Sequence, residues 1–368
     1  MSHTVQLGVF MPVFNNGWII SKNAPQFMPN WEMNQRIGRY AESIGFDFLF
    51  SAVKWRGFDG ETQHWNHTLE PVTEMSAIAA VTSRIKIIAS MVPLYLHPVV
   101  AAKMVATIDD ISDGRFGVNL VSGTYFGEFA QMGILPDDYA TTRYDRLQEW
   151  LDIVNLAWTE ERVTYKGKYW QLEDCQCSPK PIQKPRPLLV CAGMSERGMD
   201  FTAKNADMNF LAGKNFGDLT AVALQSKAVS SRVGKLNETA TVLVIIIADT
   251  DEAAEAEVQY YRDGVDVAGW QNLTQVYAED SDGKMAQALL EQAKNDVFYA
   301  ALPVYGSPKT VAEKLAKIAL DGQIDALLLT FPDYMEGLRR MDLEVKPEME
   351  RLGIQFSTTT TTSAGMGQ

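Results

Sequence analysis

Residues 84–123 read RIKIIASMVPLYLHPVVAAKMVATIDDISDGRFGVNLVSG, and this stretch decides the fold. Its two ends, 84–91 and 116–123, are short apolar runs of the kind found in strands that are buried on both faces. Between them Pro98 opens an amphipathic run that continues to Ile111, because proline suits the first turn of a helix. The stretch therefore predicts a strand, a helix and a second strand parallel to the first.

The same alternation of short apolar and longer amphipathic runs extends over the chain. We predict eight strands, at Val5–Val13, Asp47–Val53, Arg84–Met91, Phe116–Gly123, Pro187–Met194, Asp207–Gly213, Ala240–Ala248 and Asp325–Phe331. Helical patterns lie between them at Trp31–Ile44, Leu69–Thr82, Pro98–Ile111, Tyr144–Trp158, Glu252–Gly264 and Lys309–Leu320. Eight parallel strands with intervening helices close most economically into a (β/α)8 TIM barrel, although a large open sheet has the same pattern. We predict one such domain over residues 1–356.

Two connections are longer than a minimal barrel needs. They span Gly123–Arg143, after the fourth predicted strand, and Gly264–Val304, before the last predicted strand and its preceding helix. Long connections in compact domains are often functional, so both are candidates to cover a site. The tail from 357 to 368 contains a threonine run and few apolar residues, which predicts disorder.

Charge and composition exclude several classes of protein. The formal net charge of −13 argues against a nucleic-acid or anionic-membrane surface, because phosphate binding needs clustered Lys and Arg. The chain begins without a basic and then apolar leader, and no apolar run reaches transmembrane length, so we expect a cytoplasmic protein. We interpret Cys175, Cys177 and Cys191 as free thiols, since this set fits neither a disulfide framework nor a zinc site.

In a TIM barrel the catalytic groups come from the C-terminal ends of the strands and the loops after them. Here these positions carry mostly amides, hydroxyls and aromatic rings, with Glu128 as a nearby carboxylate. They hold no carboxylate pair, no Ser-His-Asp order and no His-Glu-x-x-His motif, which argues against hydrolases and metalloenzymes, and we expect no metal. Glycine-rich phosphate loops are also missing from the sequence, so a redox role would need reducing equivalents from another protein.

Three polar residues near strand ends are candidates for ligand binding, each with a structural alternative. Asn119 interrupts an apolar strand, and its amide would be satisfied either by a flat heterocycle or by neighbouring polar groups. Lys54 is suited to stabilise negative charge on such a ring, or else pairs at the surface with Glu61 or Asp59. The Ser195 hydroxyl and the helix amides behind it suit a phosphate, or Ser195 only caps the helix.

Histidine and tryptophan side chains gather in loops on the same predicted face. The run His64-Trp65-Asn66-His67 follows the second strand, and we place His67 in the substrate pocket. One imidazole of this run is a candidate proton donor, although a loop histidine more often serves packing. Trp18, Trp55 and Trp65 are candidates for apolar walls that keep water from a reactive intermediate.

Several runs are similar to those of a known family. The more specific runs are Asn15-Asn16-Gly17-Trp18 and Lys54-Trp55-Arg56-Gly57-Phe58. Others are Gly8–Pro12, Ala79–Ile85, Ala106–Asp109, Gly114–Val121, Gln131–Ile134, Arg143–Asp145, Cys191–Gly193 and Leu328–Phe331. With these runs the chain, up to its tail, resembles the luciferase-like flavin-dependent monooxygenases, and among them the pyrimidine monooxygenases of uracil degradation.

The resemblance implies a barrel that binds FMN, receives it reduced from a separate NAD(P)H-dependent flavin reductase, and uses O2 on a small-molecule substrate. A nitrogen heterocycle such as uracil is the first expectation for that substrate, and a homo-oligomer, dimer or tetramer, is expected. The matching flavin contacts are Val53, Lys54, Asn119, Glu128, Arg143, Tyr144 and Ser195. Ser90 supplies the hydroxyl expected beside O2, and we take Ser90, Asn119, Lys54 and Glu128 as the catalytic set.

One position departs from the family pattern. The family's Gly-Trp after the fourth strand is Gly123-Thr124 here, so a large aromatic wall is lost. Either Tyr125 or Phe126 refills that volume, or a larger pocket takes another substrate. Alternative substrates are sulfones, alkanesulfonates, other azaheterocycles and riboflavin, and a non-catalytic flavin-binding protein is the alternative from another class. We assign to the substrate pocket Trp18, Trp55, His67, Thr124 and Tyr125.

Overall fold

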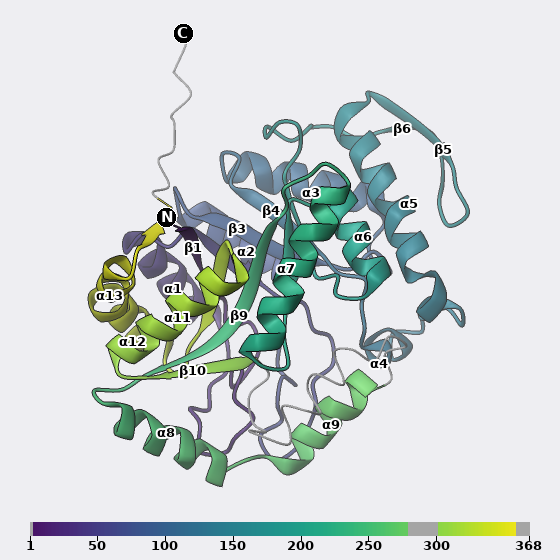
Figure 1. Cartoon of the computed structure of the whole chain (residues 1–368). Helices are drawn as coiled ribbons and strands as arrows, with labels where there is room; N and C mark the ends of the chain where they lie inside the picture. Colours follow the sequence, from purple (N-terminus) through teal and green to yellow (C-terminus); the bar gives the residue numbers. More distant parts are fainter. Residues whose placement is uncertain (1–2, 279–300, 358–368) are drawn as a thin grey trace.

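Eight parallel strands form a closed barrel in the computed structural model, which describes residues 3–278 and 301–357 (Figure 1). The strands are β1 (His3–Phe10), β2 (Phe48–Ser51), β3 (Lys86–Met91), β4 (Phe116–Leu120), β7 (Leu188–Cys191), β8 (Met208–Leu211), β9 (Glu238–Ile247) and β11 (Ala326–Thr330). Each pairs with the next in this order, and β11 pairs with β1. The predicted TIM barrel is confirmed, and the open sheet is excluded by this closure.

All eight predicted strands are present, and none extends past its predicted C-terminal end. Several stop two or three residues earlier, as β4 does at Leu120, because the chain leaves the sheet there to form the mouth of the barrel. The barrel strands are buried almost throughout, as parallel strands covered by helices should be. At Gly8 a side chain is excluded, since a Cβ would lie 2.3 Å from the Phe48 ring.

Helices cover the outside of the barrel. The six predicted helices are confirmed as α1 (Trp31–Ser43), α2 (Pro71–Val81), α3 (Pro98–Ile111), α5 (Tyr139–Thr159), α8 (Asp251–Asp263) and α11 (Pro308–Gly322). α5 begins five residues before its predicted start, so Arg143 and Tyr144 lie inside a helix. The remaining helical segments are α4 (Phe126–Ala130), α6 (Glu196–Asn205), α7 (Phe216–Arg232), α9 (Val267–Ala278), α12 (Tyr334–Arg340), the π-helical η1 (Met341–Val345) and α13 (Lys346–Arg351).

Four strands were not predicted. β5 (Arg162–Lys166) and β6 (Gln171–Gln176) form an antiparallel hairpin outside the barrel, beside α5 (Figure 1). These strands are polar and largely exposed, so they lack the apolar signal of the barrel strands. β10 (Leu302–Gly306) pairs with the C-terminal half of β9, and β12 (Ile354–Phe356) pairs with β1.

Part of the predicted long connection, residues 279–300, and the predicted disordered tail from 358 lie outside the described residues. The three cysteines are unpaired, as expected. None of the helices that the structure describes is long and apolar enough to cross a membrane.

Candidate active site

A cavity of about 240 Å³ lies at the C-terminal ends of the barrel strands. Its wall includes the ends of β3, β4, β7 and β8 and the loops after β1, β2 and β4. Nine of the predicted site residues line it: Trp18, Val53, Lys54, Ser90, Asn119, Thr124, Tyr125, Glu128 and Tyr144. These residues are far apart in the sequence, and barrel closure brings them together.

A buried ion pair joins two walls of the cavity. The Lys54 ammonium lies 3.2 Å from Glu128 Oε1, and the two side chains are only 12% and 6% exposed. Glu128 Oε1 also accepts a hydrogen bond from the Trp55 backbone N–H, at 3.0 Å. The alternative of a surface lysine is therefore wrong, and Glu61 instead pairs with Lys22.

Two aromatic rings flank the Lys54 ammonium. Its nitrogen is 5.4 Å from the centre of the Phe58 ring and 5.1 Å from that of Tyr125. The two rings are themselves almost parallel, with centres 5.7 Å apart. Packing between aromatic faces and a carboxylate leaves the cation few positions, so its charge is fixed at one side of the cavity.

Asn119 and Ser90 face each other on neighbouring strands. β3 and β4 pair these two residues directly, and Asn119 Nδ2 donates to Ser90 Oγ at 2.8 Å. Both residues are buried, yet Asn119 Oδ1 has no hydrogen-bond partner among the described residues. The Asn119 NH2 group is thus bonded to a neighbouring hydroxyl, whereas its carbonyl oxygen fits the N–H group of a bound heterocycle.

Ser195 is the N-cap of α6, as the structural alternative predicted. Its Oγ accepts a hydrogen bond from Gly198 N at 3.1 Å. Ser195 does not line the main cavity, and its assignment to a phosphate remains a prediction. The turn before it is tight, because a Cβ on Gly193 would lie 2.2 Å from the Gly198 carbonyl oxygen.

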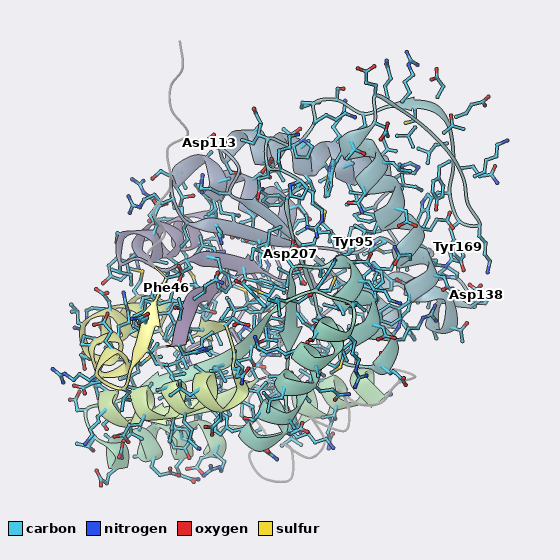
Figure 2. The ribbon with its side chains drawn as sticks, turned by 45° about the horizontal axis from the view of Figure 1, so that its top comes forward. Phe46, Tyr95, Asp113, Asp138, Tyr169 and Asp207 are labelled. Carbon is cyan, nitrogen blue, oxygen red and sulfur yellow. The ribbon has the colours of Figure 1, made fainter. Side chains whose placement is uncertain are left out.

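A second cavity of about 260 Å³ adjoins the first, and both include Ser122 and Leu147 in their walls. Arg143, predicted to contact the flavin, lines this second cavity and is buried. Arg146 follows it one turn later on α5, stacks 4.2 Å from the Tyr169 ring and pairs with Asp138. Figure 2 shows Tyr169 and Asp138 at the same edge of the molecule. The two arginines make this cavity suitable for an anionic group.

Two residues assigned to the substrate pocket do not line the cavity. Trp55 is 37% exposed and packs edge-on against Tyr95. His67 is exposed, while its backbone N–H donates to Asn15 Oδ1 and its carbonyl accepts from Asn15 N. The assignment of both to the pocket wall is corrected, because the loops turn these side chains outward. The sequence alone could not exclude these two side chains from the pocket wall, because it does not give the conformation of the loops.

The Asn-Asn-Gly-Trp run has a structural role that the sequence did not suggest. Asn15 Nδ2 donates to the Gln63 carbonyl at 2.9 Å, and Asn16 Nδ2 donates to that of Thr62 at 2.8 Å. These amides hold the loop after β2 against the loop after β1. The clamp thereby positions Trp65, whose ring lies 4.3 Å from that of Phe14 in the cavity wall.

Asp266 also holds the loop after β2, and the sequence did not suggest this residue. Its Oδ2 accepts hydrogen bonds from both the N–H and the Oγ1–H of Thr62, each at 2.7 Å. The two residues are 204 positions apart in the chain. No local pattern links them, since only the barrel brings the loop after β2 against the start of α9.

His64 is buried inside this loop and does not line the cavity. Its ring stacks on Trp65 with centres 5.1 Å apart, and neither ring nitrogen has a hydrogen-bond partner within residues 3–278 and 301–357. Burial lowers the pKa of His64 to about 3, against the opposing effect of Asp266. His64 is therefore neutral at physiological pH, and the structure does not support it as a proton donor in the pocket.

We expect acidification to destabilise the protein through His64. The unfolded imidazole takes up a proton near its ordinary pKa of 6.5, whereas the folded one does so only at about 3. Between these values the unfolded state binds more protons, so this group lowers stability by up to about 1.4 kcal/mol per unit of falling pH. Urea unfolding at pH 7, 6, 5 and 4 measures the slope, which His64→Phe should reduce.

The matched control is His67→Phe, because His67 is exposed. That variant should keep the wild-type dependence of stability on pH. Equal slopes in the wild type and in His64→Phe would show that the buried imidazole is not the titrating group.

Comparisons with known proteins show the family of this chain. Residues 5–322 match the luciferase-like monooxygenase family. The chain belongs to that family. Pyrimidine monooxygenase RutA of Stutzerimonas stutzeri is 40% identical over 94% of this chain and 97% of that protein. RutA of Acinetobacter baylyi is 38% identical over 94% of this chain and 95% of that protein.

Solved structures of luciferase-like enzymes have the same fold. Riboflavin lyase RcaE superimposes with a TM-score of 0.81 at 19% identity, over 96% of this chain and 93% of that one. Long-chain alkane monooxygenase LadA gives a TM-score of 0.79 at 20% identity, with the same coverage. Among the described residues of this family member, no cluster of three or more His, Cys, Asp or Glu could hold a metal ion.

Proposed function

We propose that this chain is the oxygenase of a two-component system that uses reduced FMN and O2 to oxidise or open a nitrogen heterocycle, with uracil the first to test. The observation that carries the proposal is the likeness to pyrimidine monooxygenase RutA over almost the full length of both chains. The Asn119 amide, whose Oδ1 lacks a partner among the described residues, supports the flavin ring with its N–H group as a ligand of the cavity.

The residues present fit FMN. We assign Val53, Lys54, Asn119 and Glu128 to its ring, and Arg143, Tyr144 and Ser195 to its ribityl phosphate. The fit rests on charge and hydrogen bonding: a fixed cation and an unpartnered acceptor line one cavity, and two arginines line the next. Reduced FMN, when bound, supplies the electrons that activate O2.

The protein's own groups hold the reactants and exclude water. Lys54, fixed by Glu128, stabilises negative charge on the ring, and the Ser90 hydroxyl is available beside Asn119 to donate a hydrogen bond to bound oxygen. The rings of Phe14, Trp18 and Trp65 contact one another and form an apolar part of the cavity wall. Such a wall limits unproductive loss of reactive oxygen species to water.

The reducing equivalents come from a separate NAD(P)H-dependent flavin reductase in this proposal. The sequence contains no glycine-rich dinucleotide loop, so a partner is needed. The proposal includes a cytoplasmic location, because NAD(P)H is available there, and a dimer or tetramer.

Oxygen uptake tests the proposal directly. Purified protein with FMN, NADH and an added reductase should consume O2 in the presence of uracil and incorporate labelled oxygen into the product. Sulfones, alkanesulfonates and riboflavin complete the panel. NADH oxidation without reductase would contradict the two-component assignment. Saturable FMN binding without turnover of any compound would identify a flavin-binding protein instead.

The Thr124 position tests which substrate the cavity is shaped for. Thr124 and Tyr125 line the cavity, whereas Phe126 does not, and its ring packs against Tyr139. Tyr125 is therefore the better candidate to refill the space of the missing aromatic wall. Thr124→Trp should reduce the cavity and shift preference toward small rings, by about 1–3 kcal/mol in discrimination. The measurement is kcat/KM for uracil relative to the best native substrate, in both proteins.

Thr124→Val is the matched control for that substitution, because it changes the hydroxyl but hardly the volume. It should leave the ratio nearly unchanged. If wild type prefers uracil and Thr124→Trp keeps the same ratio, this position does not set substrate size.

A further inference from the structure

Two indole rings line the cavity, and the hydrogen bonding of their N–H groups differs. Trp65 Nε1 donates to the Gly17 carbonyl at 2.6 Å. Trp18 Nε1 is also buried, but it has no hydrogen-bond partner in the part of the chain that the structure describes. A buried indole N–H normally finds an acceptor, because an unpaired buried donor is costly. The cavity wall thus holds one donor that finds no acceptor among the residues 3–278 and 301–357.

Packing fixes the Trp18 ring. It lies edge-on to Phe10, with centres 4.6 Å apart at 74°, and edge-on to Trp65, with centres 5.3 Å apart at 77°. The turn before it passes through positive φ at Asn16 and Gly17. The Asn16 side chain fixes this turn by accepting a hydrogen bond from Phe27 N at 3.1 Å. These contacts therefore hold the indole in place and hinder rotation of the side chain.

The surroundings of Trp18 are apolar. Phe10, Phe14 and Phe50 line the cavity and contact one another, so the indole N–H is a polar group within an aromatic surface. Asn119 Oδ1, which also lacks a partner among the described residues, is an acceptor and complements an N–H group. A carbonyl oxygen requires a donor, and Trp18 provides one.

We propose that Trp18 is a specificity-determining residue whose indole N–H donates a hydrogen bond to a ring carbonyl of the substrate. This rests on the proposed function, because it takes the substrate to be a planar heterocycle with amide carbonyls. An aromatic wall with one N–H group selects such a ring over an apolar ring of the same size, which would leave the donor unpaired.

Ligand binding to the FMN-loaded protein tests this without turnover. Three rings are titrated while the absorbance of the bound flavin is followed: uracil, pyrimidin-4-one, which lacks the C2 oxygen, and pyrimidin-2-one, which lacks the C4 oxygen. Wild type should bind uracil about tenfold or more tightly than one of the two other rings. Trp18→Phe, which removes the N–H but keeps an aromatic ring, should abolish that preference. Its FMN affinity should stay within about twofold of wild type.

Trp65→Phe is the matched control, because it deletes an indole N–H in the same wall that is already bonded to Gly17. It should retain the preference for uracil. If Trp18→Phe does not fold, Trp18→Leu removes the same donor.

Three outcomes would overturn the inference. The first is that wild type binds all three rings with equal affinity, and the second is that it binds none of them. The third is that the Trp18 variant keeps the preference, or binds all three rings more weakly by the same factor, as a packing role requires. The expected preference without oxygen uptake would leave the role of Trp18 standing and contradict the proposed function. Oxygen-dependent turnover of uracil, with an unaltered binding preference in the Trp18 variant, would support the proposed function and contradict the role of Trp18.

Discussion

Glu128→Gln should lower the free energy of unfolding by about 3–5 kcal/mol and abolish most turnover, because it leaves the Lys54 ammonium buried without its carboxylate. The same substitution weakens the hold on the Trp55 backbone N–H at the cavity entrance. Chemical unfolding measures the loss of stability, and oxygen uptake with reduced FMN measures the loss of turnover.

Two further variants separate stability from function. Glu61→Gln breaks the exposed pair with Lys22, so it should cost at most about 1 kcal/mol. Lys54→Met combined with Glu128→Gln removes both buried charges, and it should regain much of the stability but no activity. A loss of less than about 1 kcal/mol in Glu128→Gln alone would show that the pair is solvated and not a buried ion pair.

Asn119→Ala should weaken FMN binding about 5- to 150-fold, the equivalent of about 1–3 kcal/mol, since an unpartnered acceptor in the cavity wall is lost. It also removes the donor to Ser90. Fluorescence titration of FMN measures the affinity, and oxygen uptake at saturating FMN measures what remains of the reaction.

Asn237→Ala is the control for this loss. Asn237 is also a buried amide, but it donates to the Thr202 and Ala206 carbonyls and lies outside the cavity wall. Its replacement should lower stability and leave FMN affinity unchanged. Equal FMN affinity in wild type and Asn119→Ala would return Asn119 to a purely structural role.

The barrel could be read from the sequence because its signal is local. Each buried parallel strand, such as β3 or β4, is a short apolar run, and each covering helix, such as α3, has its own amphipathic period and start signal. The β5–β6 hairpin could not be read in this way. Its loop is fixed by the Glu149 carboxylate, which accepts hydrogen bonds from three successive backbone N–H groups, at Lys168, Tyr169 and Trp170.

The candidate site was predicted only as far as strand ends reveal it. Asn119, Ser90 and Lys54 stand at or beside predicted strand ends, and their place in the cavity follows from the rule that these ends meet at one face. His67 and Trp55 stand in loops, where the same rule places the backbone at the mouth but does not fix the side chain. Both turned out to lie outside the cavity wall.

By itself the sequence determined the number of barrel strands, their order along the chain and the face that carries the site, since periodicity and chain order are local properties. The tertiary structure alone decided the pairings: Lys54 with Glu128, Asp266 with Thr62, and Trp65 with Gly17. It also decided that the Trp18 N–H and Asn119 Oδ1 lack partners in the described part of the chain. Pairing depends on distances between loops that are remote in sequence, and only the closed barrel sets those distances.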